Sequence, residues 1–116
     1  MKRRAVQPEA TATTPDEFLC RALLTMKTEE EVRAFLRDLL TPAEFEAASD
    51  RWRVVPYLRA GLAYREIHDR TAVSVTTVGR VARFLQSGFG GYQLAEQRLK
   101  RRGQWPVPKA EDEGEA

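Results

Sequence analysis

The stretch 64–85, YREIHDRTAVSVTTVGRVARFL, limits the possible folds more than any other part of the chain. Its apolar residues are spaced as the buried faces of two short helices that cross at a steep angle: Ile67, Val73, Val78 and Val81. A second helix that begins at Ser74, whose hydroxyl would cap the first N–H groups, would also bury Val75. The rest of its surface is hydroxylated or basic: Thr76, Thr77, Arg80 and Arg83. This pattern is typical of a helix-turn-helix, in which the second helix enters the major groove of DNA.

Two residues in the turn depart from that motif. Ala72 holds the position that usually carries glycine, and a left-handed backbone there would cost an alanine about 1 kcal/mol. Thr71 replaces the usual apolar residue. An ordinary amphipathic hairpin with a solvated outer face would show the same spacing, so the pattern alone leaves both interpretations open.

The charge of the chain is concentrated around this stretch. The formal net charge is only +2, but residues 51–83 contain seven Lys or Arg against two Asp or Glu, a local net charge of +5. Residues 1–50 carry a net charge of −3. A phosphate backbone would favour such a basic segment, although a generic basic surface would have the same composition.

The length of 116 residues allows one domain, which is expected over residues 14–103. Residues 1–13 are short of large apolar side chains, and residues 104–116 combine two prolines with an acidic run, so both are predicted to be mobile tails. The remaining stretch is small for a self-sufficient core. Burial of apolar surface between two copies of the chain is therefore favoured.

Several classes of protein are disfavoured by composition. Cys20 is the single cysteine, which excludes an internal disulfide, and its apolar neighbours predict a buried, inert thiol. No apolar run approaches the length of a membrane span and no signal-peptide core follows the first basic residues, so a cytoplasmic location is expected. With one histidine, one cysteine and no paired carboxylates in an apolar setting, we expect no enzyme, no metal site and no cofactor.

Capping residues, prolines and glycines predict where the helices begin and end. Three helix starts show a threonine followed three residues later by a glutamate: Thr14 and Glu17, Thr28 and Glu31, Thr41 and Glu44. The first two helices are expected to bury their apolar stripes: Phe18, Leu19, Ala22, Leu23, Met26, Val32, Phe35, Leu36 and Leu39. The third should kink or break near Pro56 and end at Gly61. With a last helix after Gly91, about six helices and no strand predict an all-α fold.

The arrangement resembles the Trp-repressor-like family of small bacterial helix-turn-helix regulators. The matching segments are LLTPAE (39–44), Arg51 and Arg53, LRAG (58–61), YREI (64–67) and VTTVGR (75–80). Gly91 and Tyr92, with the helix that follows, resemble the tryptophan-independent branch of that family. The resemblance covers about residues 16–100 and implies an intertwined homodimer, with half-sites about one turn of DNA apart.

The resemblance also implies roles for single residues. DNA-facing positions would be held by Arg65, His68, Ser74, Thr76, Thr77, Gly79, Arg80 and Arg83. His68 could contact phosphate, but an exposed surface imidazole is the favoured interpretation of this residue. The positions of the tryptophan pocket of the true repressor are matched by Thr41, Arg51, Thr77 and Arg80. Phe84 stands where that family places a small hydroxyl, and its ring would tend to fill the pocket. Tryptophan is therefore not expected to be the effector, and another effector or none remains open.

Together, these residues and the resemblance predict a DNA-binding transcriptional regulator, expected to act as a repressor on a two-fold operator in double-stranded DNA. The alternative is a helical protein-interaction module or adaptor that does not read DNA sequence. The sequence does not distinguish the arginines that would contact bases from those that would contact phosphates.

Overall fold

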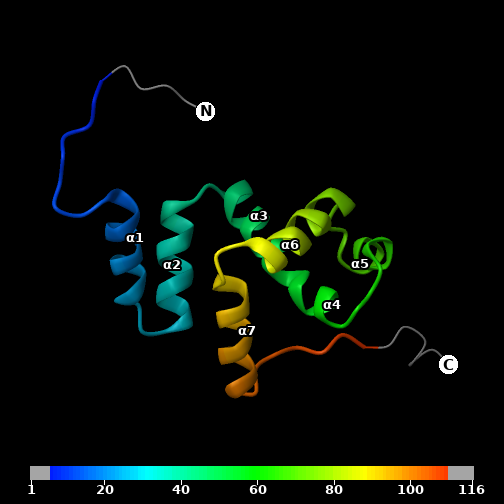
Figure 1. Ribbon diagram of the computed structural model, residues 1–116. Helices are drawn as coiled ribbons and strands as arrows, with labels where there is room; N and C mark the ends of the chain where they lie inside the picture. The colour runs from blue at the N-terminus through cyan, green and yellow to red at the C-terminus, as the bar shows by residue number, and fades with distance from the viewer. Residues whose placement is uncertain (1–5, 110–116) are drawn as a thin grey trace. The chain divides into compact units, whose positions relative to one another are not determined.

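A computed structural model describes residues 6–109 of the chain (Figure 1). The described residues form seven α-helices and no strand, which confirms the all-α prediction. The helices are α1 (Pro15–Leu24), α2 (Glu29–Leu39), α3 (Pro42–Arg53), α4 (Val55–Arg59), α5 (Tyr64–Thr71), α6 (Val75–Ser87) and α7 (Gly91–Arg101). Among these residues, no helix is long and apolar enough to cross a membrane.

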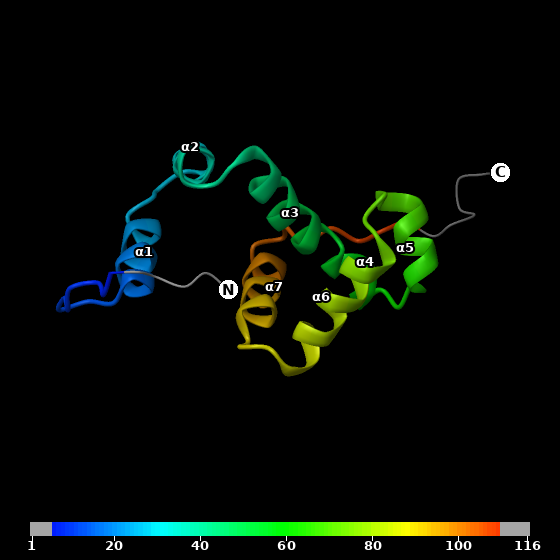
Figure 2. The ribbon, with the colours of Figure 1, turned by 90° about the horizontal axis from the view of Figure 1, so that it is seen from above.

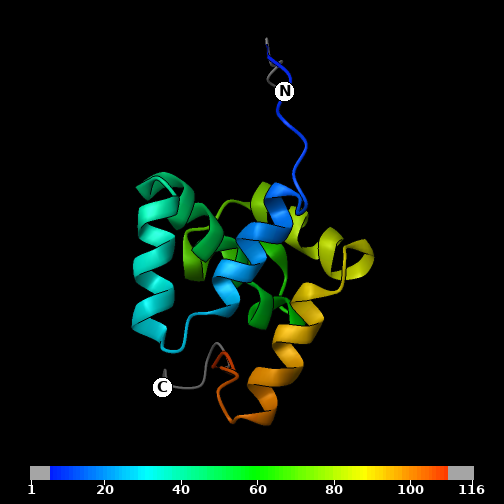
Figure 3. The same cartoon turned by 90° about the vertical axis from the view of Figure 1, so that its left-hand side faces the viewer.

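The chain divides into two compact units between Pro42 and Ala43, and each is described here by itself. The first unit contains α1 and α2, which are joined by a short turn (Figure 3). Thr14 and Glu17 form the predicted capping box, with the Thr14 hydroxyl accepting from the Glu17 amide at 3.3 Å and the Glu17 carboxylate accepting from the Thr14 amide at 3.0 Å. At α2, Thr28 accepts from the Glu31 amide at 3.1 Å. These caps satisfy N–H groups that the helices leave without a partner.

Within the first unit, the apolar stripes of α1 and α2 are not buried, contrary to expectation. Neither α1 nor α2 has a buried residue, and Phe18 and Leu24 are 70% and 83% exposed. Cys20, expected to be buried, is also exposed. The reason is geometric, because two short helices by themselves cannot enclose an apolar stripe on each. These faces stay accessible to a partner.

The second unit begins with the helix that the sequence predicted to break. Helix α3 ends before Val54, a turn residue whose backbone stays in the right-handed α region (φ −84°, ψ −11°), and α4 follows with Pro56 in its first turn. A proline is tolerated there because the first-turn amide needs no partner inside the helix. Gly61, with φ +84°, follows the end of α4 in the left-handed conformation that glycine adopts without strain. The predicted break near Pro56 and the stop at Gly61 are both confirmed.

The core of the second unit lies where α4, α5 and α6 meet. Its buried residues are Val54, Val55, Ile67, Val73, Val78, Val81 and Leu85. Each of these side chains contributes roughly 1.5–3 kcal/mol when it is fully removed from water. The four residues predicted to form the inner faces of the helix pair all belong to this core. The helix pair is therefore packed on its inner face, as both the helix-turn-helix and the amphipathic-hairpin interpretation predict.

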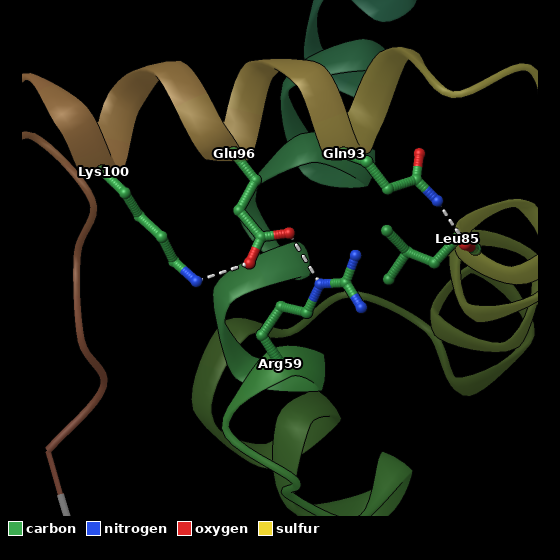
Figure 4. Close-up of polar contacts among 5 residues, drawn as sticks. All are labelled: Arg59, Leu85, Gln93, Glu96 and Lys100. Atoms are coloured by element: carbon green, nitrogen blue, oxygen red, sulfur yellow. Dashed lines mark hydrogen bonds and ion pairs between the residues drawn. The ribbon is translucent and has the colours of Figure 1, made fainter.

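Helix α7 is fastened to this core by a ring contact and by a charge cluster. Tyr92 stacks on Trp52 of α3, with ring centroids 5.7 Å apart. Farther along, Glu96 is only 7% exposed and receives Arg59 Nε at 2.8 Å and Lys100 Nζ at 2.9 Å (Figure 4). Burial of the carboxylate raises the pKa of Glu96, but the hydrogen bonds from Lys100 and Arg59 outweigh it and hold the pKa below the ordinary value of 4.5. Glu96 is therefore charged at neutral pH and ties α7 to α4.

The segment after α7 runs back toward α5, past α3 and α4 (Figure 2). Trp105 meets the Trp52 ring edge-on with centroids 5.9 Å apart, and Lys100 lies over the Trp105 ring at 5.7 Å. The carbonyl of Lys109 accepts from Arg70 Nη1 of α5 at 2.6 Å. Residues 104–109 belong to the segment 104–116, for which the two prolines and the acidic run predict a mobile tail. Residues 1–5 and 110–116, with the acidic run, lie outside the described residues.

Candidate nucleic-acid interface

The turn between α5 and α6 has the backbone that the motif requires. Ala72 has φ +64° and ψ +8°, and its amide donates to the carbonyl of His68 at 2.8 Å. This left-handed conformation costs an alanine about 1 kcal/mol relative to glycine. The strain is offset by Thr71, whose hydroxyl donates to the Ile67 carbonyl at 2.7 Å and accepts from the Val73 amide at 3.1 Å. Thr71 is buried, so its hydroxyl stabilises the turn in place of an apolar contact.

His68 also belongs to this turn. Its ring is half-buried, and Nδ1 lies 2.9 Å from the carbonyl oxygen of Val73. Because a carbonyl oxygen only accepts, Nδ1 must carry the proton and donate it. His68 is therefore not a freely exposed imidazole. Only Nε2 would be left for a contact with DNA.

The start of α6 is capped as predicted. The Ser74 hydroxyl accepts from the Thr77 amide at 3.1 Å and donates to the Thr77 hydroxyl at 3.0 Å. Both side chains are thereby committed to the cap, and Thr77 is only half exposed. The N-terminus of α6 still presents backbone N–H groups and a partial positive charge, an environment that favours phosphate.

The outer face of α6 carries the basic residues. Thr76, Arg80 and Arg83 are exposed, and their spacing of four and three residues places them on one side of the helix. The opposite side holds the core residues of α6: Val78, Val81 and Leu85. Arg65, in the first turn of α5, is exposed as well. None of these three arginines forms an ion pair with another residue between 6 and 109.

Two other arginines of the basic segment, Arg59 and Arg70, already form ion pairs. Arg70 pairs with Glu66 at 2.8 Å, and Arg59 pairs with Glu96. Arg53 makes one long hydrogen bond of 3.4 Å to the Thr71 carbonyl. The positive charge of residues 51–83 is therefore partly structural, and the share left on Arg65, Arg80 and Arg83 belongs to the helix-turn-helix.

Two residues of α6 differ in environment from the other predicted contacts. Val75, which the sequence analysis placed in the core, is 43% exposed because it is the first residue of the helix, before the buried stripe begins. Gly79 is half-buried, and a methyl group at its Cα would meet Tyr64 Cε2 at 3.6 Å, an ordinary van der Waals distance. Val75 is thus an apolar group on the outer surface, although the sequence pattern predicted that it would be buried.

A cavity lies beside this face. It has a volume of about 430 Å³ and is lined by Arg51, Arg80 and Phe84, together with residues 88–92. The structure thus brings together three of the five predicted pocket residues. Thr77 does not line it, and the exposed Thr41 belongs to the first unit. The Arg80 guanidinium lies over the Phe84 ring at 5.0 Å from its centroid, a cation–π contact that holds Arg80 against the cavity wall.

Comparison with known proteins agrees with this geometry. The family model described as Trp repressor protein matches residues 16–100, which include the whole helix-turn-helix and all the predicted site residues. The chain belongs to the Trp repressor protein family. This is a family of regulators rather than enzymes, and it suggests DNA binding for this member.

Two relatives of this family member show how far the likeness extends. The uncharacterized protein YerC of Bacillus subtilis (strain 168) is 35% identical over 82 residues, which are 71% of this chain and 79% of that protein. A solved structure, a TrpR-like protein from Eubacterium eligens ATCC 27750, is 32% identical and has a TM-score of 0.70. The match covers 84% of this chain and 96% of that one.

Proposed function

We propose that this family member is a transcriptional regulator that recognises a DNA sequence through the exposed face of α6. The observation that carries the proposal is the combination of a packed helix-turn-helix with Thr76, Arg80 and Arg83 exposed on one side of its second helix. Arg80 and Arg83 have no ionic partner among the described residues, so their charge is available to a polyanion. A helix presented in this way fits the major groove.

The residues of this face suit different parts of a duplex. An arginine that forks onto O6 and N7 of guanine gives about 1–3 kcal/mol of discrimination, whereas an arginine on phosphate sets the register. Arg65, on α5, would contact the backbone, as would the free N–H groups at the start of α6. Val75 would add an apolar contact of the kind that recognises the methyl group of thymine. Gly79 would allow the α6 backbone to approach the DNA closely.

The operator would be two-fold symmetric because the protein acts as a homodimer. The uncovered apolar faces of α1 and α2 support this step, since Phe18 and Leu24 are mostly exposed in the single chain and a second copy would cover them. Two recognition helices would then read half-sites about one turn of DNA apart. A dimer bound in this way in the cytoplasm would repress transcription by occluding the operator.

The experiment is selection of bound duplexes from a random pool, followed by affinity measurements on the enriched site. We expect a two-fold motif, and a salt dependence of the affinity whose slope falls by about one unit for each phosphate contact removed. R80A and R83A should lose at least tenfold in affinity while staying folded and dimeric. R98A, which removes an exposed arginine of α7 outside the motif, is the matched control.

Two results would count against this function. If the pool yields no motif and duplex binding disappears at about physiological salt, the protein does not read sequence. If R80A and R83A keep wild-type affinity for the enriched site, the DNA-binding face is not the exposed side of α6.

The cavity beside Arg80 would make this regulator responsive to a small anion. Arg51 and Arg80 line it, so a ligand with an acidic group would draw Arg80 toward the cavity and away from DNA. Tryptophan is a poor candidate, because the Phe84 ring occupies the position of the family's small hydroxyl and already carries Arg80. Addition of L-tryptophan is expected to leave both the melting temperature and the operator affinity unchanged.

A further inference from the structure

A second cavity lies beneath the segment that follows α7. It has a volume of about 440 Å³ and is lined by Trp52, Tyr57 and Trp105, together with other apolar residues that include Pro56 and Leu99. The family model ends at residue 100, so the wall formed by residues 105–109 lies beyond the matched part of the chain. This cavity is separate from the one beside Arg80, and the two share no lining residue.

The wall contributed by residues 105–109 is held in place at both ends. At one end Trp105 packs edge-on against Trp52, with Lys100 over its ring. At the other end Arg70 donates to the carbonyl of Lys109 at 2.6 Å. Pro106 and Pro108 lie between these anchors, and their fixed φ angles lower the entropy that is lost when the segment is ordered. The cavity is therefore a fixed feature of the second unit.

The polar groups of the cavity have one sign of charge. Arg53 and Lys109 line it, and no aspartate or glutamate does so. Within residues 6–109, neither Arg53 nor Lys109 forms an ion pair, and Arg53 makes only its long bond to Thr71. Flat aromatic walls favour a planar ring by stacking, and the two cations favour an acidic substituent on that ring.

We propose that this cavity is a binding site for a small planar aromatic anion. The ring would lie against Trp52, Tyr57 and Trp105, and the acidic group would be held by Arg53 and Lys109. The cavity volume falls in the range of about 300–1,000 Å³ that is usual for small-molecule sites. The site uses no residue of the proposed DNA-binding face, so it does not depend on the function proposed above.

The chain carries its own probe of this site. Its two tryptophans both line the cavity, so an isotope-labelled sample gives only two indole N–H signals, and both report on occupancy. The full-length protein would be titrated with 2-naphthoate and, in parallel, with 2-naphthylmethanol, a neutral molecule with the same ring system. W52F and W105F assign the two signals.

We expect 2-naphthoate to shift both indole signals along one saturating curve, with half-saturation below roughly 1 mM. The R53Q/K109Q double variant should bind 2-naphthoate about tenfold more weakly and 2-naphthylmethanol with unchanged affinity, because only the charge contact is lost. R98Q, an exposed arginine of α7 that does not line the cavity, should bind both probes as the wild type does.

The proposal is overturned if the shifts stay linear with concentration, which would mean that no site exists. It is also overturned if R53Q/K109Q binds 2-naphthoate as tightly as the wild type, or if the neutral probe binds more tightly than the anion. Arg53 and Lys109 are exposed, so the double variant should fold normally, and its remaining amide spectrum provides the check.

Discussion

Replacement of Gly79 by alanine should raise stability and lower DNA affinity at the same time. Gly79 lies inside α6, where an alanine is favoured over glycine by about 1 kcal/mol. The added methyl group would meet Tyr64 Cε2 at 3.6 Å, so it fits without displacing a neighbour. A gain of about 1 kcal/mol corresponds to roughly 4 °C in melting temperature for a domain of this size. On the DNA side, the same methyl group would keep the α6 backbone away from the groove.

The measurement pairs thermal unfolding with operator binding over a series of salt concentrations. We expect the melting temperature to rise by a few degrees and the affinity to fall roughly tenfold, with an unchanged salt slope because no charge is removed. R80A is the contrast, since it should lose about one unit of slope. A lower melting temperature for G79A would refute the packing argument. A stabilised variant with wild-type affinity would show that Gly79 does not face DNA.

Three further predictions concern stability and assembly. A72G should stabilise the protein by about 1 kcal/mol, seen in chemical denaturation, because it relieves the φ of +64°; an unchanged midpoint would contradict the strain at this turn. E96Q should lower the free energy of unfolding by about 2 kcal/mol at pH 7. Because the folded pKa of Glu96 is lowered, its contribution is complete above the ordinary value of 4.5 and is lost as the pH falls through the folded pKa, so the difference between wild type and E96Q should shrink in acid. F18S should shift a wild-type dimer to monomer in sedimentation at micromolar concentration, and a wild type that is itself monomeric would remove the proposed dimer.

Local chemistry made much of the fold predictable. Thr14 and Thr28 begin helices where the sequence placed them, since a side-chain cap needs only residues three positions apart. Pro56 breaks the third predicted helix, and Gly61 takes a left-handed backbone, because both follow from the covalent geometry of a single residue. The inner faces of α5 and α6 followed from helical periodicity.

The surroundings of individual site residues could not be predicted as well from the sequence. His68 donates to a carbonyl five residues away across the turn, and Val75 is exposed although it is apolar and adjacent to the buried stripe. Periodicity gives the average direction of a helix face, but it does not say which residue at a helix end escapes burial.

The sequence by itself determined the helices, where they end and the position of the strained turn at Ala72, because each depends on residues close together in the chain. It also determined the membership in a family of regulators, because that depends on motifs of fixed spacing. Only the tertiary structure decided that Glu96 is buried between Arg59 and Lys100 and that Trp105 closes a cavity over Trp52. It also decided that α1 and α2 do not bury each other's apolar faces within the first unit. These features depend on contacts between segments far apart in sequence, or on the lack of such contacts. No local pattern encodes them, because burial is a property of what packs on a surface and not of the surface alone.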